Sequence, residues 1–119
     1  MESTNTLGQQ GEDLALAFLQ ENGLTLIQRN YRSRYGEIDL VMQDKQHVVF
    51  VEVRFRSSNS FGGALLSVDR RKQSKLIKCA QQYMANESSR LGFRFDVIAI
   101  SPASSQHDIQ WITNAFDEF

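Results

Sequence analysis

The sequence is poor in cysteine and in long apolar runs. Its single cysteine, Cys79, excludes an internal disulfide, which makes the reducing cytoplasm the default location. The longest unbroken apolar run is six residues, Leu14 to Leu19, far short of the roughly 20 that a membrane-spanning helix needs. The first five residues are polar, without a basic flank, so we expect no signal peptide and no membrane partner.

What remains is the composition of an ordinary globular domain. The chain has 119 residues, of which 41% are hydrophobic and 23% are charged. That length suits one compact core, and the composition argues against disorder, collagen and coiled coil. We therefore expect a single domain over residues 1–119, with flexible polar residues 1–7 at its start.

The net charge of −1 hides an uneven distribution of basic side chains. Three short windows hold ten of the thirteen: Arg29, Arg32 and Arg34; Arg54 and Arg56; and Arg70, Arg71, Lys72, Lys75 and Lys78. Such clusters are found on faces that bind phosphate, and also on ordinary solvated surfaces. Charge alone leaves both interpretations open.

Hydrophobic periodicity predicts two helices and five strands. Residues 8–22 carry apolar side chains at helical spacing before Gly23, a natural C-cap, and residues 69–87 carry a second apolar stripe. Strands are expected at residues 24–31, 38–43, 48–55, 93–100 and 109–113. Residues 48–55 are apolar on both faces, which is typical of a central strand. The order α-β-β-β-α-β-β predicts an α/β fold, with a helix on each face of a mixed sheet of about five strands.

Two acidic residues fall on neighbouring strands of this sheet. If the turn is centred between residues 45 and 46, the numbers of cross-strand partners sum to 91, and Asp39 faces Glu52 on one side of the sheet. Like charges directly opposite each other destabilise a sheet, and burying an unpaired carboxylate costs several kcal/mol. Something must therefore compensate the pair.

Two arrangements would supply this compensation. One is a divalent cation, because a few hard oxygen ligands with open positions for water and phosphate describe a Mg²⁺ site. The other is a lattice of structural ion pairs, in which Arg54 and Arg56 neutralise the two carboxylates and Glu37, the partner of Arg54 in this register. Spacing alone leaves both arrangements open.

An ordered set of motifs carries a family resemblance. Its segments are Gly36-Glu37-Ile38-Asp39-Leu40, Val51-Glu52-Val53-Arg54, Phe61-Gly62-Gly63-Ala64, Arg71-Lys72-Gln73, Arg94-Phe95-Asp96-Val97 and Trp111-Ile112. Asp39, twelve intervening residues and then Glu52-Val53-Arg54 resemble the signature of the PD-(D/E)XK nuclease superfamily. The whole set resembles the YraN family of uncharacterised, endonuclease-like bacterial proteins, which is similar to archaeal Holliday-junction resolvases. The resemblance implies a restriction-endonuclease-like core.

The resemblance also implies a metal site and catalytic residues. Asp39 and Glu52 correspond to ligands of a Mg²⁺ or Mn²⁺ ion. The carbonyl of Val53 corresponds to a third oxygen, and Glu12 to a glutamate that resolvase-like relatives aim at the same metal. Glu37 corresponds to a further catalytic residue, as an additional ligand or a neighbour of the ligands.

The main departure from the superfamily pattern is Arg54, which stands where the superfamily has a lysine. An arginine stays protonated, so it cannot act as a base, although it can bind the scissile phosphate or stabilise the transition state. Arginine is tolerated at this position within the YraN group. A second departure is Ile38, which replaces the usual proline before the first aspartate.

Basic residues around this site are expected to bind a phosphate partner. Cations crowd the first turn of the second helix, where they oppose the helix dipole unless an anion docks there. The polar loop 57–63 is expected to close over DNA, and Lys72 and Gln73 to line the active face. The expected nucleic-acid contacts are Arg32, Arg34, Arg56, Arg70, Arg71, Lys72 and Gln73.

The sequence therefore predicts a divalent-metal-dependent endonuclease that hydrolyses phosphodiester bonds in structured or branched DNA. One alternative is a catalytically silent module that binds DNA or RNA on the same fold. Another is an interaction protein in which the acidic pair is only a remnant. DNA is the expected partner ahead of RNA, and the two-fold symmetry of a four-way junction leaves a homodimer open.

Overall fold

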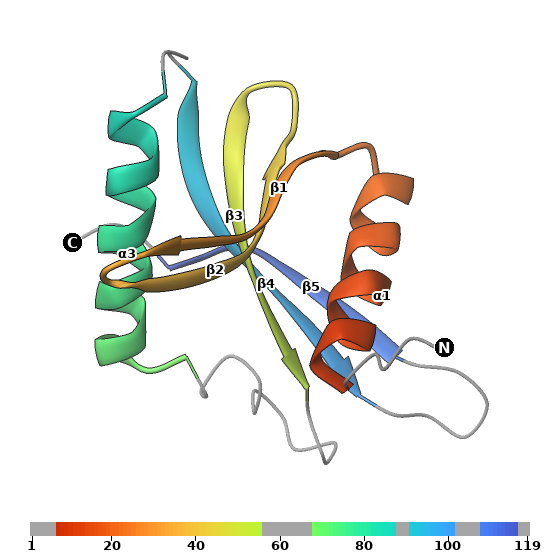
Figure 1. Cartoon of the computed structure of the whole chain (residues 1–119). Helices are drawn as coiled ribbons and strands as arrows, with labels where there is room; N and C mark the ends of the chain where they lie inside the picture. Colours follow the sequence, from red (N-terminus) through yellow and green to blue (C-terminus); the bar gives the residue numbers. More distant parts are fainter. Residues whose placement is uncertain (1–6, 56–67, 88–90, 102–107, 117–119) are drawn as a thin grey trace, which may run out of the picture.

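The computed structural model describes residues 7–55, 68–87, 91–101 and 108–116. They form α1 (Leu7–Glu21), β1 (Thr25–Ser33), β2 (Gly36–Gln43), β3 (His47–Phe55), α3 (Arg70–Ala85), β4 (Gly92–Ser101) and β5 (Asp108–Phe116) (Figure 1). This order is the predicted one. Among these residues no helix is long and apolar enough to cross a membrane. The expected contact Arg56 and the expected loop 57–63 lie outside the described residues.

Both helices are bounded by specific capping interactions. α1 ends in a Schellman motif, in which Gly23 has a φ of 95° and the N–H of Leu24 donates to the carbonyl of Leu19 at 3.1 Å. α3 begins after Asp69, whose carboxylate accepts a hydrogen bond from the N–H of Lys72 at 2.9 Å. Because the start of a helix is electropositive, Asp69 offsets the basic side chains that crowd this turn.

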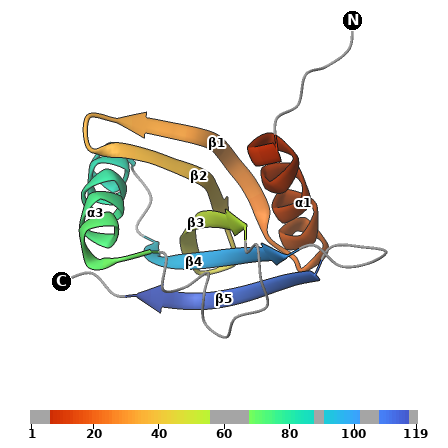
Figure 2. The same ribbon diagram turned by 90° about the horizontal axis from the view of Figure 1, so that it is seen from below.

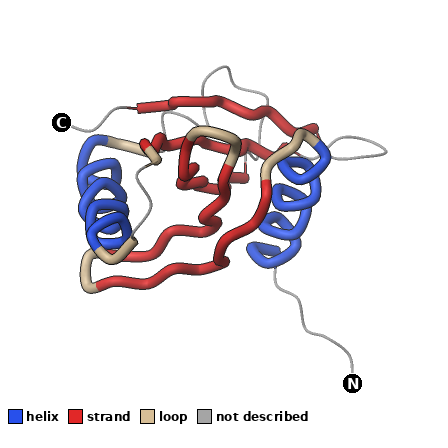
Figure 3. Tube along the Cα trace, turned by 90° about the horizontal axis from the view of Figure 1, so that it is seen from above, coloured by secondary structure: helices blue, strands red, loops and turns tan. Residues whose placement is uncertain are grey.

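The strands form one mixed sheet in the order β1-β2-β3-β4-β5. β1, β2 and β3 are antiparallel neighbours, β3 and β4 are parallel and joined through α3, and β4 and β5 are antiparallel. The apolar strand β3 lies at the centre, as its two apolar faces predict. Figures 2 and 3 show α1 and α3 on opposite sides of the strands. The predicted α/β architecture is confirmed.

Each helix covers its own hydrophobic core. Val48 and Phe50 of β3 pack in the core under α3, together with Leu76 of that helix. Val49 and Val51 alternate with them and pack in the core under α1. These four side chains are each 2% exposed or less, so the middle of β3 is buried from both sides.

β2 changes sides at Asp39. Ile38 packs in the core under α3, whereas Leu40 packs in the core under α1. Residues two apart on a regular strand share a face, so the strand must turn over between them. Opposite this point on β1, Asn30 adopts a positive φ of 54°, a conformation that asparagine tolerates better than most residues. Figure 2 shows the β1–β2 hairpin turned away from the layer of β4 and β5.

A buried aspartate ties β4 and β5 to the β2–β3 turn. Asp96 is 0% exposed and accepts hydrogen bonds from Arg94 Nε at 3.0 Å, Trp111 Nε1 at 2.9 Å and the N–H of Asn114 at 2.9 Å. Arg94 also donates to Asp44 of the turn at 2.6 Å. The β4–β5 register shifts at Asp96. The Asp96 carboxylate accepts the N–H of Asn114, which this irregularity leaves free of the ladder. Two of the segments that carry the family resemblance, at residues 94–97 and 111–112, therefore have a structural role in this network.

Removing the charge of Asp96 should destabilise the protein strongly. Asp96→Asn removes the buried negative charge beside Arg94, which keeps only Asp44, so we expect a loss of about 3 kcal/mol in the free energy of unfolding. The control Asp13→Asn removes a half-exposed carboxylate that pairs with Arg29 at 2.8 Å, and it should cost less than about 1 kcal/mol. Urea unfolding of both variants measures the difference. Equal losses would contradict a structural role for Asp96.

Candidate metal and nucleic-acid site

The β2–β3 hairpin brings Asp39 and Glu52, hereafter the acidic pair, into contact. The turn consists of Lys45 and Gln46, and it is closed by a hydrogen bond of 3.0 Å from the N–H of Asp44 to the carbonyl of His47. The numbers of partners on the two strands sum to 91, and the last regular pair is Leu40 and Val51. The predicted register is therefore confirmed as far as Leu40 and Val51, and the acidic pair follows directly after this last pair of the ladder.

Asp39 takes a backbone partner where the two strands separate. Its Oδ2 accepts a hydrogen bond of 2.9 Å from the N–H of Val53, and its carboxylate shares a hydrogen bond with Glu52. Burial raises the pKa of Asp39, against the lowering effect of these two hydrogen bonds. The bond to Val53 fixes the side chain between the strands, so its position follows from the change of side of β2.

Glu52 is the more strongly perturbed member of the acidic pair. The residue is 8% exposed. Burial and the neighbouring Asp39 carboxylate raise the pKa of Glu52 to about 7. Near neutral pH the acidic pair therefore binds a proton part of the time, as two carboxyl groups do when they are forced together without a cation.

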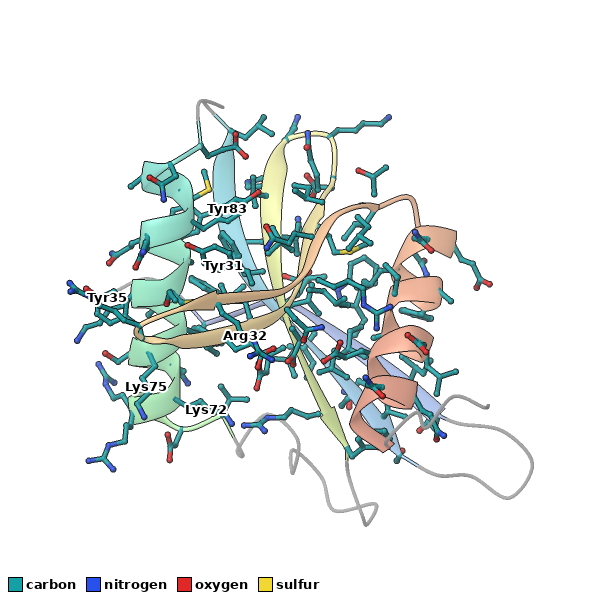
Figure 4. The ribbon with its side chains drawn as sticks, viewed as in Figure 1. Tyr31, Arg32, Tyr35, Lys72, Lys75 and Tyr83 are labelled. Carbon is teal, nitrogen blue, oxygen red and sulfur yellow. The ribbon has the colours of Figure 1, made fainter. Side chains whose placement is uncertain are left out.

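Two cationic side chains approach the same oxygen of Glu52. Arg54 Nε lies 3.5 Å and Lys72 Nζ lies 3.8 Å from Glu52 Oε2. Arg54 follows on β3, whereas Lys72 comes from the first turn of α3, at the lower end of that helix in Figure 4. The two side chains are 22% and 42% exposed, so each is partly open to solvent.

Glu37 lies beside the acidic pair but not opposite Arg54, where the register placed it. The β2–β3 ladder has ended by this point, and Glu37 instead pairs with Arg32 of β1. Arg32 Nε lies 3.7 Å from Glu37 Oε2, and the Arg32 side chain is 80% exposed. The charge of Glu37 still contributes to raising the pKa of Asp39.

Glu12 reaches the site from α1. Its carboxylate accepts hydrogen bonds from Arg29 at 3.4 Å and from Asn30 at 3.3 Å, while burial and the charge of Asp39 raise its pKa. With its amide reversed, Asn30 donates to Glu37 Oε2 at 2.8 Å and to Glu12 Oε2 at 3.2 Å, so it bridges the two carboxylates. Sequence reasoning missed Asn30, because a single asparagine in a strand gives no signal of its positive φ.

The chemistry of the acidic pair fits a hard divalent cation. Carboxylate oxygens are the ligands that Mg²⁺ prefers, and it usually keeps several positions for water and substrate phosphate. In the described part of the chain, no three His, Cys, Asp or Glu side chains form a ready metal-binding group. A cation would therefore rest on Asp39, Glu52 and a backbone oxygen. Val53, the expected source of that oxygen, follows Glu52 on β3 and pairs with Ile98 of β4.

The other expected nucleic-acid contacts lie in different places. Arg70 and Arg71 are exposed in the first turn of α3. The side-chain nitrogen of Gln73 donates to the carbonyl of Val68 at 2.9 Å, so this amide group helps to hold the start of the helix. Arg34 is exposed at the tip of the β1–β2 hairpin. The structure thus gathers Lys72 and Arg32 near the acidic pair and sets Arg34 apart.

The fold and the acidic pair define an α/β domain with a buried and a half-buried carboxylate at the diverging end of a central hairpin. The chain belongs to the uncharacterised protein family UPF0102, whose model matches residues 11–100. It is similar to a UPF0102 protein of Nitrosomonas europaea, at 49% identity over 99% of both chains. A UPF0102 protein of Stutzerimonas stutzeri is 47% identical over 98% of this chain and 99% of its own. The predicted membership of the YraN family, which is UPF0102, is confirmed.

The raised pKa of Glu52 predicts pH-dependent stability in metal-free buffer. A carboxyl group with a raised folded-state pKa stabilises most below its ordinary pKa of 4.5, and this contribution is lost as the pH rises to about 7. Glu52→Gln keeps a hydrogen-bond donor for Asp39 but cannot ionise. We expect it to match the wild type near about pH 4 and to exceed it by about 3 kcal/mol near about pH 8. Urea unfolding in EDTA measures this.

The same experiment with Mg²⁺ tests the metal site without an activity assay. A cation that binds only the folded protein adds to its stability, so Mg²⁺ near about pH 8 should stabilise the wild type. Glu52→Gln, which lacks one ligand, should gain little. A wild type with the same pH profile as Glu52→Gln would contradict the raised pKa. A wild type insensitive to both Mg²⁺ and Mn²⁺ would contradict the metal site.

Proposed function

We propose that this protein is a metal-dependent endonuclease that hydrolyses phosphodiester bonds in structured DNA. The observation that carries the proposal is the close approach of half-buried Asp39 and buried Glu52, two carboxyl groups whose pKa values are both raised. Strongly perturbed acidic groups with specific charged partners are characteristic of functional sites. Arg54 and Lys72 beside Glu52 add the cations that a phosphate partner requires.

In this proposal the acidic pair holds a Mg²⁺ or Mn²⁺ ion with a backbone oxygen of Val53. When bound, the ion polarises a phosphate oxygen and lowers the pKa of a water molecule. The side chains of the protein position the reacting groups. Asp39 is kept in place by the N–H of Val53, and Arg54 and Lys72 donate to the oxygens of the scissile phosphate as negative charge develops on them.

Lys72 compensates for the lysine that the superfamily pattern has at position 54 and that this chain replaces with Arg54. The superfamily lysine would stand at position 54, but a lysine from α3 reaches Glu52 at 3.8 Å. In the proposal Lys72 supplies the ammonium group beside the acidic pair. Arg54 acts as a planar clamp for phosphate, a role that suits a guanidinium better than an ammonium group.

A second candidate function is a module that binds DNA or RNA without cutting it. The observation that favours it is Arg54, which can hold a phosphate but cannot take a proton from an attacking water. Branched DNA as the preferred substrate rests on the resemblance to Holliday-junction resolvases. A homodimer rests on the same resemblance, because a four-way junction has two-fold symmetry.

Asp39→Asn should slow cleavage strongly and leave the fold intact. Asparagine keeps an oxygen for the N–H of Val53, but it removes the carboxylate charge. We expect the wild type to cut a labelled four-way junction with Mg²⁺ or Mn²⁺ and not with EDTA. The variant should be slower by about a hundredfold or more. Gel assays with junction, duplex and single-stranded substrates measure this.

Two further variants separate effects on folding from effects on cleavage. Asp39→Ala leaves the N–H of Val53 without its acceptor, which costs about 1–3 kcal/mol, so it confuses folding with catalysis. Asp13→Asn removes an exposed carboxylate from α1 and should cut like the wild type. Cleavage by Asp39→Asn at the wild-type rate would contradict the proposal. DNA binding without cleavage of any substrate would favour the silent module.

A further inference from the structure

A hollow on the surface lies between the tip of the β1–β2 hairpin and α3. It has a volume of about 580 Å³ and is lined by Arg34, Tyr35, Lys78, Gln81 and Gln82. These residues supply two cations, two amides and a phenol, and none of the five carries a carboxylate. Figure 4 shows Tyr35 beside α3, further along the helix than Lys72 and Lys75.

One aromatic ring holds both cations of this hollow. The guanidinium carbon of Arg34 lies 5.0 Å from the centroid of Tyr35, and its Nη2 donates to the Tyr35 hydroxyl at 2.9 Å. Lys78 Nζ comes from α3 and lies 5.9 Å from the same centroid. The N–H of Tyr35 donates to Ser33 Oγ at 3.0 Å, which fixes the turn. The ring thus gathers two like charges, and an anion between them would relieve their repulsion.

The hollow lies along α3 from the acidic pair. Lys78 follows Lys72 by six residues, which corresponds to about 9 Å along the helix axis. Lys75 lies between them at three-residue spacing and is exposed. Phosphates of one DNA strand are about 3.4 Å apart along the duplex axis, so about 9 Å corresponds to two or three nucleotides of a duplex whose axis runs along α3.

We propose that this hollow binds a backbone phosphate of the same nucleic-acid strand whose reacting phosphate lies at the acidic pair. The two phosphates are about two or three nucleotides apart. The inference rests on the proposed function and adds a second contact that sets the position of the strand. Arg34 and Lys78 supply the charge, Gln81 and Gln82 supply further donors, and Tyr35 keeps the two cations together.

Binding of DNA to the full-length protein in EDTA tests the subsite without cleavage. Lys78→Gln should bind a labelled junction or duplex about fivefold more weakly near about 50 mM salt. It should also reduce the slope of log affinity against log salt by about 0.9. Lys78→Arg should keep most of the affinity. The matched control is Lys45→Gln, which removes an exposed charge from the β2–β3 turn and should change neither quantity.

Oligonucleotides with one neutral methylphosphonate locate the contact on the strand. The wild type should lose affinity at two sensitive positions, about two or three nucleotides apart. Lys78→Gln should become insensitive at one of them, and Lys72→Gln at the other. A single position affected by both variants would overturn the proposed spacing. Thermal melting of each variant verifies that the substitutions leave the fold unchanged.

The outcomes separate this inference from the proposed function. If Lys78→Gln binds DNA no more weakly than Lys45→Gln, the inference fails and the proposed function stands. If inorganic phosphate shifts the amide signals of Tyr35 and Lys78 while DNA affinity does not depend on Lys78, the hollow takes only small anions and the inference also fails. If the wild type binds no DNA, both fail. If binding depends on Lys78 but nothing is cut, the subsite stands and the nuclease activity fails.

Discussion

The hydrogen bond from the N–H of Val53 to Asp39 forms because β2 changes sides at this residue and the β2–β3 ladder ends there. It holds one carboxylate in the opening between two strands, directly against Glu52. In an uninterrupted ladder the two like charges would face each other without this backbone partner, which destabilises a sheet. Arg54 and Lys72 approach the site at the same point, because the charge of Glu52 is buried and needs partners. The candidate site therefore depends on an interruption of the sheet.

The two buried acidic groups of this fold differ in how their hydrogen bonds are satisfied. Asp96 accepts hydrogen bonds from Arg94, Trp111 and a backbone amide, and it forms a complete network between strands. The acidic pair instead brings two carboxyl groups together, and burial raises the pKa of both. Fully satisfied hydrogen-bond networks help to specify a fold. Carboxyl groups with perturbed pKa values and oxygens left open for a ligand are characteristic of functional sites. This contrast assigns Asp96 to the architecture and leaves the acidic pair as the candidate site.

A net charge of −1 does not prevent a local basic surface. Lys72, Lys75 and Lys78 follow one another along α3 at three-residue spacing, so they are neighbours on the helix surface. Asp69 caps the start of this helix, which allows basic residues in its first turn at a smaller cost. The local field of such a surface, and not the total charge, governs encounters with an anionic strand.

The sequence by itself determined the order of the elements, the central place of β3, the cap at Gly23 and the register of the β2–β3 hairpin. These features follow from local periodicity, from single capping residues and from the length of one turn. Only the tertiary structure decided that Glu37 pairs with Arg32 instead of Arg54, that Lys72 reaches Glu52, and that a tyrosine gathers two cations at the hairpin tip. A register predicted from the alternation of side chains assumes regular pairing along the whole hairpin, so it does not show where the two strands separate. The separation itself arises from the twist of the sheet and its packing against two helices, which residues far apart in the sequence determine together.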